Sequence, residues 1–136
     1  QKVDAVDIGT SQLHSKIKED NKVTSYENTD IRTFTSPYPY TIIVADLSFI
    51  PLTRVLEKII SFGTIGTTFF LLIKPQFEVG KGNTTKGIVK NLSKIIEVLD
   101  FYKNEAERVG LRKAKIIPSE IKGGGGNQEY FLHGTL

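Results

Sequence analysis

Apolar residues are arranged along the chain in two alternating patterns, short continuous runs and helix-spaced positions. Residues 41–45 and 67–73 form nearly continuous apolar runs of strand length, which is typical of strands covered on both faces. Apolar positions recur at intervals of three and four over 52–60 and 95–109, which predicts two helices ending near Gly63 and Gly110. The same criteria predict short strands over 3–7, 23–26, 114–118 and 130–133, and a helix over 11–20 that Ser11 caps. Alternation of buried strands with helices indicates an α/β layered fold.

The C-terminal part departs from this alternation. The strands over 114–118 and 130–133 are joined by the glycine run 123–126, with no helix between them. We therefore expect an antiparallel final pair on an otherwise parallel sheet. Residues 75–92, rich in Gly, Lys and Thr, are predicted to form a long loop of the functional or mobile kind.

Composition limits the class of protein. The 136 residues suffice for one domain or most of one, and 39% hydrophobic with 24% charged residues is typical of a soluble globular protein. A cytoplasmic location is expected, because the absence of Cys fits that compartment without requiring it. No apolar run approaches the roughly 20 residues that span a bilayer, and no secretory signal is recognised, so no membrane partner is expected. The chain has no Cys, which excludes disulfides and thiolate metal sites, and its His residues show no metal-ligand spacing. The net charge of +3 permits an anionic partner such as RNA without requiring one.

Charged residues directly after buried strands are the strongest candidates for chemistry. Asp46 follows the run 41–45, and Lys74 follows 67–73. Parallel strands would bring both to the same carboxyl edge, where ligands gather in open α/β sheets. A strand-end salt bridge without chemistry remains the alternative. Glu129 opens the last strand, so one pocket could hold two acids and an amine.

Two further acids could bind a nucleotide. Asp7 ends the first strand before a glycine, where a carboxylate can accept from ribose hydroxyls or simply cap the turn. Asp30 could accept from an adenine amino group or make a loop hydrogen bond. Glu78 and the lysines of the following loop are expected to be solvated surface, and His133 is expected to be a strand-face residue.

Five segments carry a resemblance to a known family. They are Ala5-Val6-Asp7-Ile8-Gly9, Gln12-Leu13, Asp46-Leu47-Ser48-Phe49-Ile50, Lys74-Pro75-Gln76-Phe77-Glu78 and Gly126-Asn127-Gln128-Glu129-Tyr130-Phe131-Leu132-His133. In this order they resemble the hemolysin A (TlyA) family of FtsJ-like methyltransferases, over nearly the whole chain.

The resemblance implies a fold and an activity. The fold would be the Rossmann-like methyltransferase sheet, mostly parallel with an antiparallel last strand. The activity would be methyl transfer from S-adenosylmethionine to ribose 2′-hydroxyls of ribosomal RNA, acting on the RNA or on ribosomal subunits. Asp46, Lys74 and Glu129 match the family's catalytic residues, with Lys74 helping to deprotonate the hydroxyl. Asp7, Asp30 and Asp46 would contact the cofactor.

The chain also departs from the family pattern. The family's first strand, its glycine loop, its first catalytic lysine and its N-terminal S4-type RNA-binding domain have no counterpart here. Residues 1–136 are therefore expected to be a partial methyltransferase domain that lacks a mid-sheet strand and is inactive alone. The alternative function is a non-catalytic protein that binds RNA or ribosomes. A membrane-active cytolysin is less favoured, since no amphipathic basic helix or spanning segment is present.

Overall fold

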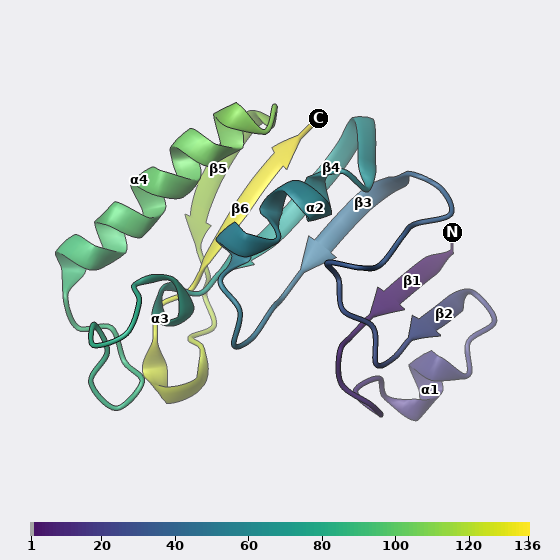
Figure 1. The fold of residues 1–136 in the computed structure, drawn as a ribbon, viewed down its shortest axis with the longest axis horizontal. Coiled ribbons are helices and arrows are strands. Elements are labelled where there is room, and N and C mark those ends of the chain that lie inside the picture. Colours follow the sequence, from purple (N-terminus) through teal and green to yellow (C-terminus); the bar gives the residue numbers. More distant parts are fainter. Residues whose placement is uncertain (1) are drawn as a thin grey trace. The chain divides into compact units, whose positions relative to one another are not determined.

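A computed structural model describes residues 2–136 and divides the chain into two compact units, Gln1–Pro37 and Tyr38–Leu136 (Figure 1). The first unit contains strand β1 (Val3–Val6), helix α1 (Ser15–Lys18) and strand β2 (Val23–Tyr26). The two strands are parallel and form a two-stranded sheet, with Val3 opposite Val23. Both strands were predicted and are confirmed.

The helix predicted over 11–20 is wrong in its extent. Only residues 15–18 are helical, and the N-cap is His14, whose Nδ1 accepts from the backbone N–H of Lys16 at 3.3 Å. Ser11 has a φ of 55°, in the left-handed region, so its backbone cannot begin a right-handed helix at that position.

The second unit is built on a four-stranded sheet in the order β3-β4-β6-β5. The strands are β3 (Tyr40–Ala45), β4 (Gly63–Ile73), β5 (Arg112–Pro118) and β6 (Tyr130–Thr135). Strand β3 is parallel to β4, whereas β6 is antiparallel to both β4 and β5. The predicted antiparallel final pair is confirmed, since the glycine-containing connection leaves no crossover helix between β5 and β6.

Helices cover one face of this sheet. The longest is α4 (Leu92–Arg108), which runs beside β5 in Figure 1 and buries Ile95, Val98, Tyr102 and Ala106. Asn91 caps its N-terminus through Oδ1, and Gly110 follows its C-terminus with a φ of 82°. The predicted helix over 52–60 is divided into the 3₁₀ helix η1 (Leu52–Arg54) and helix α2 (Leu56–Ile60), because Val55 has the non-helical φ of −129°.

The two faces of the sheet differ in burial. Phe69, Leu71 and Ile73 alternate along β4 and are completely buried. On β3, however, Ile42 and Val44 are 56% and 74% exposed, so the prediction that both faces of this strand are covered is wrong. Val44 pairs with Phe70, which is 41% exposed and lies on the same open face. The core of this unit therefore lies between the sheet and the helices on one side only.

Two short helices interrupt the predicted loops. Helix α3 (Pro75–Glu78) begins directly after β4, with Lys74 as its N-cap and Pro75 in the first position. The glycine run forms the 3₁₀ turn η2 (Gly124–Gly126), in which Gly125 has a φ of 78°. These two elements flank the ends of β4 and β6 and position the candidate site.

Candidate functional site

Asp46 and Lys74 meet at the carboxyl edge of the sheet, as the sequence predicted. Strands β3 and β4 are parallel, with Ala45 paired to Leu71, so both chains leave the sheet at the same edge. Lys74 Nζ lies 2.6 Å from Asp46 Oδ1 and donates to Ser48 Oγ at 3.0 Å. The Lys74 side chain is 12% exposed and that of Asp46 is 69% exposed. The amine is thus held from two sides while its carboxylate partner faces solvent.

Glu129 is a buried acid beside the end of β4. It precedes β6, whose first residue Tyr130 pairs with Ile73, the last residue of β4. The Glu129 side chain accepts at Oε1 from Nε2 of Gln76 at 2.8 Å, and the residue is 7% exposed. The structure therefore links Glu129 to the segment that carries Lys74 through Gln76. Sequence reasoning did not single out Gln76, although it lies within the segment Lys74–Glu78.

The expectation that Glu78 is solvated surface is wrong. Its Oε1 accepts from the backbone N–H of Leu52 at 2.7 Å, and its Oε2 lies 3.4 Å from Thr53 Oγ1. Burial raises the pKa of Glu78, and burial together with the charge of Glu78 raises the pKa of the enclosed Tyr102. The carboxylate thus caps the start of η1, and it fixes the segment that follows Asp46 against α3.

An exposed aromatic side chain lies in the segment after Asp46. Phe49 is 91% exposed and has a φ of 66°, which is rare for a bulky residue. Its ring centroid lies 5.5 Å from that of Phe77 on α3. Residues with strained backbone angles of this kind cluster at active sites and ligand-binding segments.

The loop after α3 is tied to the glycine run by one buried side chain. Asn127, 4% exposed, accepts at Oδ1 from the N–H of Val89 at 3.0 Å and donates to the carbonyl of Gly87 at 2.8 Å. The loop itself turns tightly between Thr85 and Ile88, whose backbones exchange two hydrogen bonds. The predicted loop is therefore a fixed structure at this point, with three lysines along it (Lys81, Lys86 and Lys90).

The first unit holds the two acids expected at a nucleotide. Asp7 follows β1, and its Oδ1 accepts from the N–H of Gly9 at 2.6 Å. The backbone carbonyl of Asp7 also accepts from the N–H of Thr29 at 3.0 Å, which brings the segment before Asp30 next to it. One carboxylate oxygen of Asp7 is thus engaged by its own turn, as the capping alternative anticipated.

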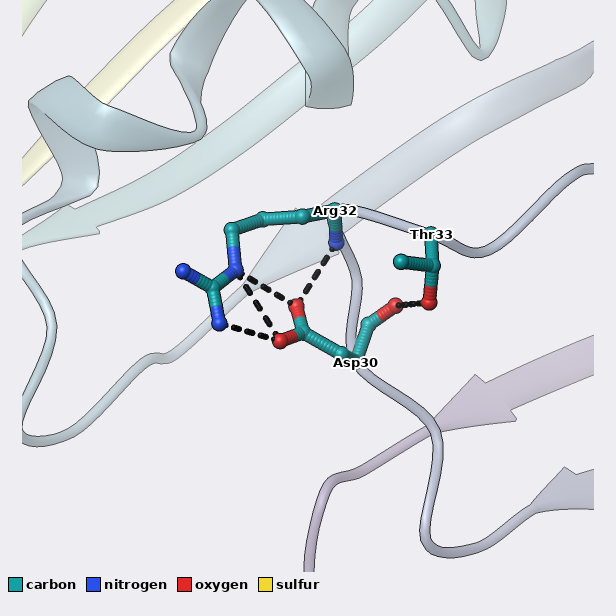
Figure 2. Close-up of polar contacts among 3 residues, drawn as sticks. All are labelled: Asp30, Arg32 and Thr33. Carbon is teal, nitrogen blue, oxygen red and sulfur yellow. Dashed lines mark hydrogen bonds and ion pairs between the residues drawn. The ribbon is translucent and has the colours of Figure 1, made fainter.

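Asp30 makes a loop hydrogen bond, which was one of the two alternatives that the sequence left open. Figure 2 shows the guanidinium of Arg32 against both of its carboxylate oxygens, while Thr33 Oγ1 donates to its backbone carbonyl at 3.1 Å. The Arg32 guanidinium lowers the pKa of Asp30 to about 2. An amino group of a ligand would have to share these oxygens with Arg32.

Residues 2–136 contain neither a candidate metal cluster nor a membrane-spanning helix. No group of three or more His, Cys, Asp or Glu side chains there is arranged to hold a metal ion. No helix in that part of the chain is long and apolar enough to cross a membrane.

His133 lies on strand β6, and its ring centroid is 4.7 Å from that of Phe70 on β4. This contact confirms the interpretation of His133 as a strand-face residue.

Comparison with known proteins gives a consistent result. A 23S rRNA (cytidine-2′-O)-methyltransferase TlyA from Campylobacter jejuni is 36% identical over 134 residues, which are 97% of this chain and 52% of the relative. Hemolysin A of Brachyspira hyodysenteriae is 32% identical, over 98% of this chain and 58% of the relative. The chain thus spans about half the length of these curated relatives.

The fold comparison agrees with the sequence comparison. The solved structure of a "putative hemolysin" from Streptococcus thermophilus superposes with a TM-score of 0.88 at 32% identity, covering 97% of this chain and 50% of the other. The family model for the FtsJ-like methyltransferase matches residues 1–136. The predicted methyltransferase fold is confirmed, and the chain belongs to the FtsJ-like methyltransferase family.

Proposed function

We propose that this chain is the catalytic part of an S-adenosylmethionine-dependent methyltransferase that modifies ribose 2′-hydroxyls of ribosomal RNA. The observation that carries the proposal is the contact of Lys74 with Asp46 and Ser48 at the carboxyl edge of a sheet of this family. An amine held by a carboxylate at such an edge is suited to proton transfer with a bound hydroxyl. The C. jejuni relative, named as an rRNA (cytidine-2′-O)-methyltransferase, supports the substrate class.

Each unit, taken by itself, has acidic side chains that could accept hydrogen bonds from the cofactor. In the first unit Asp7, anchored through one oxygen to Gly9, could offer its other oxygen to ribose hydroxyls, and Asp30 could accept from an amino group alongside Arg32. In the second unit Asp46 could accept from an amino or hydroxyl group.

When bound, S-adenosylmethionine supplies an electrophilic methyl group on a sulfonium. Lys74 Nζ would take up the proton of the substrate hydroxyl, and to do so it must first have passed its own extra proton to Asp46 or to solvent. Asp46 and Ser48 hold that nitrogen in place, and Glu129, which accepts a hydrogen bond from Gln76 two residues after Lys74, is the third residue assigned to the catalytic set.

The exposed ring of Phe49 is consistent with an RNA substrate. RNA recognition commonly uses aromatic side chains that stack on unpaired bases. Phe49 lies three residues after Asp46, so a base stacked on it would be close to the proposed reaction centre.

Methyl transfer tests this function. Intact protein is incubated with ribosomal subunits or their RNA and S-adenosylmethionine carrying a labelled methyl group. Asp46→Ala and Lys74→Ala should abolish incorporation, because each removes one half of the ion pair. Lys94→Ala is the matched control, since it breaks a surface ion pair with Glu97 and should retain activity.

The same experiment separates the alternatives. Undiminished transfer by both site variants would refute the assignment of Asp46 and Lys74. RNA binding without any transfer by the native protein would instead support a non-catalytic RNA- or ribosome-binding protein. Lysis of liposomes by the pure protein would support the hypothesis of a membrane-active cytolysin.

A further inference from the structure

The carboxylate of Glu129 is confined by two neighbours that no sequence motif assigned. The Gln76 side chain donates to its Oε1 at 2.8 Å. On another side lies the backbone of Gly123, where an added Cβ would stand 2.1 Å from Oε1 and 2.5 Å from Cδ of Glu129. No side chain can occupy that space unless the carboxylate moves.

Gly123 is required here for space and not for backbone conformation. Its φ of −67° and ψ of 173° are accessible to any residue. The backbone around it is also fixed, because its N–H donates to the carbonyl of Asn127 at 2.9 Å and its carbonyl accepts from the N–H of Gly126 at 3.0 Å. The bare Cα is therefore a rigid surface against which the carboxylate packs.

Gln76 fixes the same carboxylate from the side of Lys74. Only the amide nitrogen can donate to a carboxylate, so this hydrogen bond determines which way the amide points. Gln76 lies two residues after Lys74, at the start of α3, and Pro75 between them restricts the backbone. The position of Glu129 is thus coupled to the segment that holds the amine.

We propose that Gln76 and Gly123 are positioning residues that hold the Glu129 carboxylate in one orientation at the methyl-transfer site. The inference rests on the proposed function, in which Glu129 belongs to the catalytic set. Glu129 is only 7% exposed, so it has few other partners available. If it lost the hydrogen bond from Gln76, or the space beside Gly123, its carboxylate would turn away from the site or draw in water. Neither Gln76 nor Gly123 is required to touch the substrate.

Adjacent glycines provide a matched kinetic test. Gly123→Ala should lower kcat for methyl transfer about 100-fold, the effect of displacing a catalytic group by about 1 Å, with KM for S-adenosylmethionine unchanged. Gly124→Ala should leave kcat within about twofold, since nothing lies within 4 Å of an added Cβ there. Gln76→Leu should lower kcat in the same way as Gly123→Ala. Thermal unfolding confirms that each variant is folded before its kinetics are compared.

A spectroscopic measurement tests the contact without relying on activity. The side-chain amide resonance of Gln76 is assigned by its absence in Gln76→Leu, and it should shift in Gly123→Ala and in Glu129→Gln but not in Gly124→Ala. Equal kcat values for the two alanine variants, or an unshifted Gln76 resonance in Gly123→Ala, would overturn the inference. If the native protein transfers no methyl group, the proposed function fails, and the resonance alone decides whether Gln76 and Gly123 position Glu129.

Discussion

Replacing Asn127 by alanine should loosen the loop beside the candidate site. In the native protein this side chain bonds the N–H of Val89 and the carbonyl of Gly87, which are 38 and 40 residues away in the sequence. Val89 is 8% exposed, so its N–H has little access to water once the side chain is removed. The carbonyl of Gly87 belongs to an exposed residue and can be solvated instead.

The loss of stability follows from the different exposure of the Val89 N–H and the Gly87 carbonyl. A buried N–H left without an acceptor destabilises by about 1–3 kcal/mol, and the lost second hydrogen bond adds about 1 kcal/mol. We therefore expect Asn127→Ala to lower the free energy of unfolding by about 2–4 kcal/mol. Asn83→Ala is the matched control, because Asn83 is exposed and makes a single bond to the carbonyl of Val79, and it should cost less than about 1 kcal/mol.

Urea denaturation measures the free energies, and amide hydrogen exchange locates the effect. The Val89 amide should exchange slowly in the native protein and in Asn83→Ala, but rapidly in Asn127→Ala. A loss below 1 kcal/mol in Asn127→Ala, or an equal loss in both variants, would refute the reasoning. An unchanged Val89 exchange rate in Asn127→Ala would refute it as well.

Three further predictions concern charge and core packing. Burial raises the pKa of Glu78 above its ordinary value of 4.5, so between the ordinary and the raised pKa the folded state binds more protons than the unfolded state. Protonation of Glu78 therefore favours the folded state at low pH, and this stabilisation is lost as the pH rises through the folded-state pKa. Glu78→Gln removes the titration, so the native protein should gain stability relative to the variant as pH falls in urea titrations; a constant difference would contradict this. Leu132→Ala, at a fully buried position, should lower the free energy of unfolding by about 2–5 kcal/mol. Leu92→Ala, at a position that is 73% exposed, should lower it far less. Equal losses in the two variants would be inconsistent with the core described. Arg32→Ala should raise the pKa of Asp30 from about 2 toward 3.8 in a carboxyl NMR titration, and an unchanged midpoint would show that Arg32 is not the cause.

Local sequence patterns were sufficient for most elements of the fold. Apolar runs and helical spacing predicted the strands and α4, because these signals depend on neighbours within a few residues. The extents of the shorter helices were mispredicted where single residues, such as Ser11 and Val55, take non-helical backbone angles. Those angles depend on packing and turns that no local pattern records.

The sequence predicted the part of the candidate site that follows from the strand topology alone. Asp46 and Lys74 come together because each follows a buried strand, and parallel strands end at one edge. The catalytic and cofactor roles of these residues, of Glu129, and of Asp7 and Asp30 stay predictions for the experiments above.

The sequence by itself determined the α/β class, the reversed last strand and the family resemblance, since periodicity and short motifs are written in consecutive residues. Only the tertiary structure decided the long-range partners of Gln76, Glu78 and Asn127, which lie 25 to 53 residues away in the chain. It also decided that one face of β3 is open. Such contacts and exposures depend on how the elements pack, and a buried carboxylate in a polar segment carries the same local signal as a solvated one.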